Sequence, residues 1–215
     1  MSTLVPLAPS PIETPIPLGT NVILDSAATF IDRELVSGGS PWRLLRLAGA
    51  SHALAERWRH GGVVQAGEER FARTLILQGL LRPHFNAELH VDELDVVVPI
   101  FDNITSLHTF LGQLQGFHVT VVDDGSPESD DIRTCCATFG ADLIRLDVNQ
   151  GAARARNVGS NATSRKFLWF IDADVSMDNT LDVAGRLFSV FGDPLVAAVA
   201  PRVCGSDDHS MRERF

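Results

Sequence analysis

Two aspartates separated by one residue are the clearest candidates for chemistry in this chain. Asp172 and Asp174 directly follow the apolar run at residues 167–171, which is typical of a strand buried in a parallel sheet. Alternate carboxylates at the end of such a strand can offer oxygen ligands to one hard divalent cation, Mg²⁺ or Mn²⁺, that also binds phosphate oxygens. The alternative is that both carboxylates cap the helix that follows.

A second acidic group follows another predicted strand. Asp123 and Asp124 precede Gly125 and Ser126, and these residue types are common in simple turns. The functional interpretation is that one carboxylate accepts the imide N–H of uracil, while Gly125 lets a ligand approach the backbone closely. Both interpretations place the group at the end of a strand.

A glycine and an arginine form the third candidate group. Gly151 precedes a predicted helix at residues 152–162, and the free N–H groups of a helix N-terminus bind phosphate well. Arg156 can add charge-assisted hydrogen bonds to the same anion. Arg154 lies two residues away and therefore cannot share that helix face.

The elements that must position these groups begin at Leu94. From there predicted strands alternate with predicted helices, which is typical of β-α-β units and a mainly parallel sheet. Ligands of such α/β sheets lie beyond the carboxyl ends of the strands, so all three groups are expected at one edge. The predicted strands are residues 94–99, 119–122, 143–146, 167–171 and 196–200, and the predicted helices are residues 104–114, 132–139, 152–162 and 181–191.

An earlier unit is predicted ahead of this sheet. Ser40 and Pro41 form a good N-cap and first-turn pair, so a helix is expected to begin there. This unit is expected to contain two short strands and three helices, at residues 21–25, 29–32, 41–47, 51–59 and 68–80. The expected organisation is a mobile, proline-rich leader, the first unit, a linker and a second domain, at residues 1–17, 18–85, 86–93 and 94–215.

Charge and cysteine content exclude several classes of function. The 215 residues include 18 basic and 27 acidic ones, a formal net charge of −9, and the acidic excess falls after residue 90. Such a region will not bind a nucleic-acid backbone through its overall field. Cys135, Cys136 and Cys204 form neither a disulfide framework nor a metal motif, which favours a reduced, cytoplasmic setting. We find no secretory signal, and no apolar stretch approaches the roughly 20 residues of a membrane span.

Four motifs, in this order, resemble those of family 2 glycosyltransferases with the GT-A fold. They are residues 96–99, 121–126, 149–151 together with 155–159, and 170–174. The likeness extends over about residues 94–205. It implies a Rossmann-like α/β donor half with a mainly parallel sheet, which binds a nucleotide-sugar donor. It also implies transfer of the sugar to a hydroxyl with inversion.

The resemblance further implies roles for single residues. Pro99 and Phe101 would line the base pocket, and Asp124 would contact uracil. Asp174 would bind the Mg²⁺ or Mn²⁺ that bridges the diphosphate, with Asp172 beside it. The other residues expected at the nucleotide-sugar are Asp123, Gly125, Ser126, Gly151, Arg156 and Ala173.

Residues 18–85 resemble the small PqqD-like winged-helix modules, which hold peptide precursors. Together the two resemblances imply that a hexose, glucose from UDP-glucose, is moved to a peptide-derived acceptor. The alternative is that this first unit serves only in packing or dimerisation.

Two other functions remain open on the sequence alone. The apolar strand before Asp172 also fits the first motif of HAD-type phosphatases, in which Asp172 would be the nucleophile. Against it, that motif needs a downstream lysine, and the only lysine, Lys166, lies upstream. The second alternative is a non-enzymatic module that binds a peptide along an edge strand of the first unit.

The acceptor side of the site is expected to be incomplete. An inverting transfer needs a general base within reach of the acceptor hydroxyl, and the resemblance implies that this base lies downstream of the Asp172–Asp174 motif. After residue 200 only Asp207, Asp208 and Glu213 are acidic, in a stretch that is expected to be loop or early helix. We therefore expect an inactive or donor-binding fragment, with the general base beyond Phe215. An anchor to the inner face of the cell membrane would also lie there.

Overall fold

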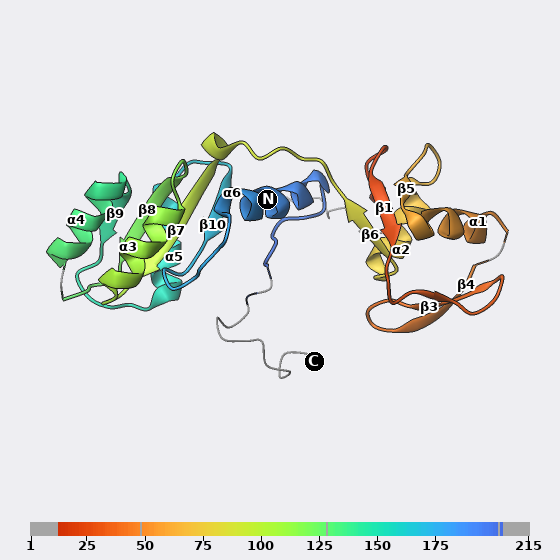
Figure 1. Ribbon diagram of the computed structural model, residues 1–215, viewed down its shortest axis with the longest axis horizontal. Helices are drawn as coiled ribbons and strands as arrows, with labels where there is room; N and C mark the ends of the chain where they lie inside the picture. The colour runs from red at the N-terminus through yellow and green to blue at the C-terminus, as the bar shows by residue number, and fades with distance from the viewer. Residues whose placement is uncertain (1–12, 48, 128, 202, 204–215) are drawn as a thin grey trace, which may run out of the picture. The chain divides into compact units, whose positions relative to one another are not determined.

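The computed structural model describes residues 13–47, 49–127, 129–201 and 203 (Figure 1). The chain divides into two compact units. The second unit comprises residues 88–185, and the first combines the residues before Glu88 with those from Arg186 onward. Cys204, Asp207, Asp208, Glu213 and the first twelve residues of the expected leader lie outside the described residues.

A four-stranded parallel sheet forms the centre of the second unit. Its strands are β7 (Leu94–Ile100), β8 (His118–Asp123), β9 (Asp142–Arg145) and β10 (Phe167–Phe170). They lie in the order β10-β7-β8-β9, and every neighbouring pair is parallel. All seven residues of β7 are buried, as expected for a strand covered on both faces. The expected α/β sheet is therefore confirmed.

Helices cover both faces of this sheet. They are α3 (Ile104–Gln113), α4 (Ser129–Phe139) and α5 (Ala152–Ala162). The next helix, α6 (Thr180–Ser189), begins in the second unit and ends among residues grouped with the first. Because successive strand residues point to opposite faces, Val96 packs in the core with α3 and α4, whereas Val97 packs with Ala155 of α5. A Cβ at Gly159 of α5 would lie 2.4 Å from Val97 Cγ1. The absence of a side chain at this position therefore lets α5 lie close against the sheet.

The first unit contains two antiparallel three-stranded sheets. One has the order β5-β1-β6 and the other the order β2-β3-β4. The strands are β1 (Asn21–Leu24), β2 (Thr29–Phe30), β3 (Leu35–Gly38), β4 (Arg43–Arg46), β5 (Gly62–Val63) and β6 (Leu81–His84). The helices are α1 (Ala50–Arg57), which continues into the 3₁₀ turn η1 (Trp58–His60), and α2 (Glu69–Leu77). The core gathers around the fully buried Trp58.

The helix predicted at residues 41–47 is wrong, because this stretch contains strand β4. Leu45 packs on the core opposite Val36 of β3, whereas Leu44 is 51% exposed. This alternation has the period of a strand. A short apolar run is compatible with either a helix or a strand. Here the pairing with β3 makes the segment a strand. The third predicted helix, residues 68–80, also ends earlier than expected, at Leu77.

The strand predicted at residues 196–200 is also wrong, since these residues form no regular element. After α6 the chain makes a 3₁₀ turn, η3 (Val190–Gly192), and Asp193 then pairs with Arg73 of α2 at 2.6 and 2.7 Å. Both side chains are buried. The described residues from Arg186 on therefore group with the first unit, whereas the sequence predicted them to be part of the second domain.

No helix in the described part of the chain is both long and apolar enough to cross a membrane.

Candidate functional site

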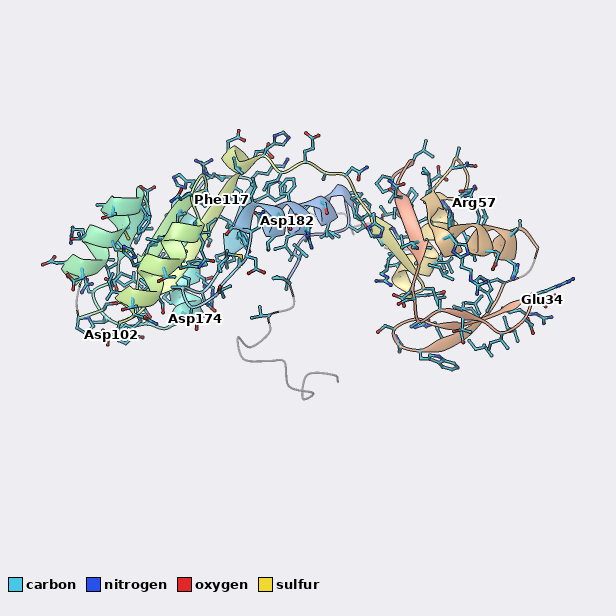
Figure 2. All side chains as sticks on the ribbon, viewed as in Figure 1. Glu34, Arg57, Asp102, Phe117, Asp174 and Asp182 are labelled. Carbon is cyan, nitrogen blue, oxygen red and sulfur yellow. The ribbon has the colours of Figure 1, made fainter. Side chains whose placement is uncertain are left out.

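A cleft of about 260 Å³ opens at the carboxyl ends of β7, β8 and β10. Figure 2 shows Asp102 and Asp174 at this edge of the second unit and Phe117 at the opposite edge. Seven of the residues expected at a site line the cleft: Pro99, Phe101, Asp124, Gly151, Asp172, Ala173 and Asp174. The topology of the sheet thus brings together segments that lie up to 75 residues apart in the chain.

The two aspartates after β10 have different surroundings. Ile171 N–H donates to Val97 O at 3.2 Å, which extends the strand pairing up to Asp172. The Asp172 carboxylate forms an ion pair with Arg156 of α5. The Asp174 side chain is exposed, and no described residue forms a hydrogen bond or ion pair with its carboxylate. Asp174 is therefore the carboxylate that is available to a cation.

Asp124 is nearly fully buried and still lines the cleft. Its two carboxylate oxygens accept the backbone N–H groups of Gln150 at 2.8 Å and Gly151 at 2.7 Å. A carboxylate offers about four lone-pair sites, so Asp124 can still accept a ligand N–H. Its own N–H donates to Ile100 O at 2.9 Å, which fixes the position of this carboxylate relative to β7.

Gly125 has a different role from the expected one. Its φ is +80°, and a Cβ there would lie 2.7 Å from the Val148 carbonyl carbon and 2.8 Å from the Asn149 nitrogen. The close approach that requires glycine is therefore made by the chain before α5, and Gly125 does not line the cleft.

Asp123, Ser126 and Arg156 are not among the residues that line the cleft. Asp123 is buried and forms an ion pair with Arg145 at the end of β9. Ser126 is also buried, and its hydroxyl oxygen accepts the Asp102 N–H at 2.9 Å. Arg156 contacts Asp172 from beside the cleft.

The N-terminus of α5 offers fewer free amides than the sequence predicted. Gly151 N–H donates to Asp124 and also to Asn149 Oδ1 at 3.1 Å, so it is not available to a phosphate. The Ala152 N–H in the first turn has no partner among the described residues, and Ala152 lines the cleft. The free amide that can bind an anion is therefore that of Ala152 and not that of Gly151.

Four residues that line the cleft were given no role from the sequence, although one of them, Asn149, lies in the third motif; they are Ile100, Asn103, Asn149 and Ala152. Asn103 carries a recognisable signal, since it caps α3 by accepting the Ser106 N–H at 3.2 Å and asparagine is a preferred N-cap. Arg145 was also missed, because a single arginine at a strand end matches no motif.

Two carboxylates at the cleft fit a cation that is shared with a ligand. Among the described residues, no three histidine, cysteine, aspartate or glutamate side chains are grouped closely enough to form a complete metal site. Mg²⁺ is commonly bound by one or two carboxylates, with substrate phosphates and water completing its coordination. The donor set of Asp172 and Asp174 suits that arrangement.

The cysteines of the second unit do not belong to the cleft. Cys135 and Cys136 of α4 are buried in the core beside α3. Burial, followed by the charges of Cys135 and Asp123, raises the pKa of the Cys136 thiol to about 11. Such a thiol is almost never deprotonated at neutral pH and is a poor nucleophile.

A parallel α/β sheet binds its ligands beyond the carboxyl ends of its strands, and comparison with known proteins specifies the family. Residues 95–213 match glycosyl transferase family 2. Because this match covers more than half of the chain, the chain belongs to that family. The resemblance drawn from the four motifs is thus confirmed, and the phosphatase alternative for Asp172 is removed.

Among its relatives is the pre-mycofactocin glycosyltransferase of Mycobacterium tuberculosis, found in two strains. The chain is 34% identical to it over 197 residues, which is 88% of this chain and 40% of the relative. It is also 33% identical over 86 residues to an uncharacterized glycosyltransferase of Haemophilus influenzae, covering 38% of this chain and 29% of that protein. The chain therefore spans about 40% of the length of the mycobacterial relatives.

Solved structures of S. aureus TarS are also similar to this chain. They are 27% identical to it over 44% of its length, with a TM-score of 0.38. The match covers 19% of one TarS structure and 31% of a 1–349 structure determined in complex with UDP.

Proposed function

We propose that the cleft binds the nucleoside diphosphate of a sugar donor together with a divalent cation. The protein would then transfer a hexose, glucose from UDP-glucose, to an acceptor hydroxyl with inversion. The observation that best supports the proposal is that three sets of ligand-binding groups lie at one edge of the sheet. These are an exposed aromatic ring beside a buried carboxylate, a free amide at a helix N-terminus and a pair of aspartates. Membership of family 2 supports the reaction class.

The base of the donor would bind at the end of the cleft next to β7 and β8. Phe101 is 48% exposed and lines the cleft, so its ring can stack on a planar base. Pro99 adds a second apolar surface. Asp124 would accept the imide N–H of uracil with the lone pairs that Gln150 and Gly151 leave free.

The diphosphate would bind at the other end, between α5 and the turn after β10. The Ala152 N–H and the positive end of the α5 dipole favour an anion there. Asp174 would bind Mg²⁺ or Mn²⁺, whose charge neutralises the diphosphate as it leaves. Arg156 keeps Asp172 oriented beside that site, so Asp172 would be a secondary ligand.

The acceptor would be a peptide-derived mycofactocin precursor. This proposal is supported by the name of the mycobacterial relatives and by the resemblance of the first unit to PqqD-like modules. The three aspartates of the cleft are assigned to the donor, so the general base that deprotonates the acceptor hydroxyl must come from elsewhere. We propose that it lies beyond Phe215, in the part of the relatives that this chain does not span.

Calorimetry with UDP, UDP-glucose and GDP-mannose in the presence of Mn²⁺ tests the donor assignment. We expect the two uridine compounds to bind at least about tenfold more tightly than GDP-mannose, a difference of about 1.4 kcal/mol. Preference for GDP-mannose, or no binding of any of the three, would overturn the proposal.

A further inference from the structure

Arg145, the last residue of β9, contacts the residues on both sides of the turn that contains Asp124, namely Asp123 and Ser126. Its guanidinium pairs with the Asp123 carboxylate and also donates to the Ser126 carbonyl oxygen at 2.8 Å. We propose that Arg145 is a positioning residue that sets where the cleft presents its base-recognising groups. This inference rests on the proposed function, in which Asp124 accepts the imide N–H of uracil.

The turn is fixed from several directions around this arginine. Asp123 and Arg145 lie opposite each other in the parallel pairing of β8 with β9. The Asp123 carboxylate also accepts the Ser126 N–H at 2.9 Å, and its carbonyl oxygen accepts the Leu146 N–H at 2.8 Å. A planar guanidinium can make two such contacts at once in a fixed geometry. Asp124, which lies between the two fastened residues, therefore has little freedom to move.

The second wall of the cleft depends on the same arrangement. Ser126 accepts the Asp102 N–H at 2.9 Å through its hydroxyl oxygen. Asp102 has a φ of +51°, an uncommon conformation that aspartate adopts more readily than most residues. Its neighbours Phe101 and Asn103 line the cleft. Arg145 thus acts on Phe101 through Ser126 and Asp102, although the arginine itself does not line the cleft.

Discrimination between pyrimidines is the property that this positioning should control. Uracil carries a hydrogen on N3 that a carboxylate can accept, whereas cytosine has no hydrogen on N3. A site built around such an acceptor rejects the base that lacks the donor, and this rejection requires the acceptor to be correctly placed. If Arg145 positions Asp124, its substitution should lower the preference for UDP over CDP.

A purely structural role predicts a different result. Arg145 also neutralises a fully buried carboxylate, and a variant that merely weakened the fold would bind UDP and CDP less tightly by the same factor. The ratio of the two dissociation constants therefore separates the two roles, because loss of stability cancels from it.

Two variants and two matched controls make up the experiment. Arg145→Lys keeps the charge next to Asp123, but a single ammonium cannot reproduce the guanidinium fork. Ser126→Ala removes the acceptor for Asp102 without changing any charge. The controls are Arg133→Lys, at an exposed position on α4, and Ser160→Ala on α5, whose hydroxyl donates to the nearby Asn157 carbonyl. Dissociation constants of UDP and CDP are measured by calorimetry with Mn²⁺, and thermal unfolding is followed in parallel.

We expect the preference for UDP over CDP to fall about tenfold in Arg145→Lys and about threefold in Ser126→Ala, with both controls unchanged; these factors match the loss of one charged and one neutral hydrogen bond. An unchanged preference in the folded variants would overturn the inference while leaving the proposed function intact. If Arg145→Lys does not fold, the UDP-over-CDP preference of Ser126→Ala tests the inference alone. A wild-type chain that binds no UDP, or that does not prefer UDP to CDP, would instead overturn the assignment of Asp124.

Discussion

Asp172 and Asp174 share one motif, but the structure gives them different electrostatic surroundings. Asp172 is occupied by Arg156, whereas the Asp174 carboxylate has no partner among the described residues. The spacing of two aspartates predicted a shared cation, and it contained no information about which carboxylate is available. That distinction depends on an arginine of α5, 16 residues earlier in the chain, which reaches Asp172 only in the folded protein.

The thiols of α4 allow a direct test at the scale of single residues. With its pKa raised to about 11, Cys136 would be deprotonated in about one molecule in a thousand at pH 8. We expect the peptide that contains Cys135 and Cys136 to resist iodoacetamide in the native protein and to react rapidly in urea. Mass spectrometry of the digested protein measures the labelling. Rapid native labelling of this peptide would contradict the buried position of α4.

Residue types could be predicted from the sequence better than their partners. Pro99, Phe101, Asp124 and Asp174 were recognised from motifs, and the structure brings them to one cleft. The partner of Asp123 was not recognised, because Arg145 lies 22 residues away and its contact depends on the parallel pairing of β8 with β9. A site residue with a motif can be found in the sequence, whereas a residue that acts through another needs the fold.

At the scale of elements, the packing of α5 against the sheet depends on one glycine. A Cβ at Gly159 would lie 2.4 Å from Val97 and 3.1 Å from Val122, both of which are buried and stiff at χ1. We expect Gly159→Ala to lower the free energy of unfolding by about 1–3 kcal/mol through overpacking, although alanine favours helix by about 1 kcal/mol. Urea denaturation measures the change.

Gly185 of α6 provides the matched control, because a Cβ there would meet no atom within 4 Å. Gly185→Ala should leave stability unchanged or raise it by up to about 1 kcal/mol, since only helix propensity changes. If both variants were equally stable, the close contact between α5 and the sheet would be refuted.

The strands and helices of the second unit could be predicted because continuous apolar runs alternate with segments of helical periodicity. The wrong prediction for residues 41–47 of the first unit shows where such prediction fails. Residues 41–47 carried a helix-start signal at Ser40 and Pro41, yet pairing with β3 made this segment a strand. Pairing with a neighbouring strand is not visible in the local pattern of a single segment, and local propensity yields to it.

At the scale of each whole unit, one buried ion pair joins two segments of the first unit that lie far apart in the sequence. Arg73 and Asp193 are 120 residues apart and are almost fully buried. Arg73 Nε also donates to Thr14 O at 3.0 Å. No sequence signal pairs two charges so far apart, and for this reason the return of the chain after α6 could not be predicted.

This pair predicts a specific loss of stability in acid. Burial would raise the pKa of Asp193, but hydrogen bonds from Arg73 and the Leu195 amide, together with the charge of Arg73, lower it below its ordinary value. Because the pKa is lower in the folded state, the stabilisation is fully present above the unfolded-state pKa of about 3.9 and is lost as the pH falls through the folded-state pKa.

Asp193→Asn tests this by urea denaturation at pH 7 and pH 3. We expect the variant to be less stable than wild type by about 3–5 kcal/mol at pH 7, the usual cost of leaving a buried charge without its partner. The difference should narrow at pH 3. Asp178→Asn, at an exposed position, is the control. Equal stability of Asp193→Asn and wild type at pH 7 would show that the pair does not stabilise the first unit.

We propose that Asp174, in the turn after β10, binds the cation that holds the donor diphosphate. The most direct test compares UDP binding with and without Mn²⁺ in wild type, Asp174→Ala and Asp178→Ala, the last an exposed aspartate outside the cleft. We predict that Mn²⁺ strengthens UDP binding at least about tenfold in wild type and in Asp178→Ala, an effect worth about 1.4 kcal/mol, and has no effect in Asp174→Ala. An undiminished effect of Mn²⁺ in Asp174→Ala would contradict the account.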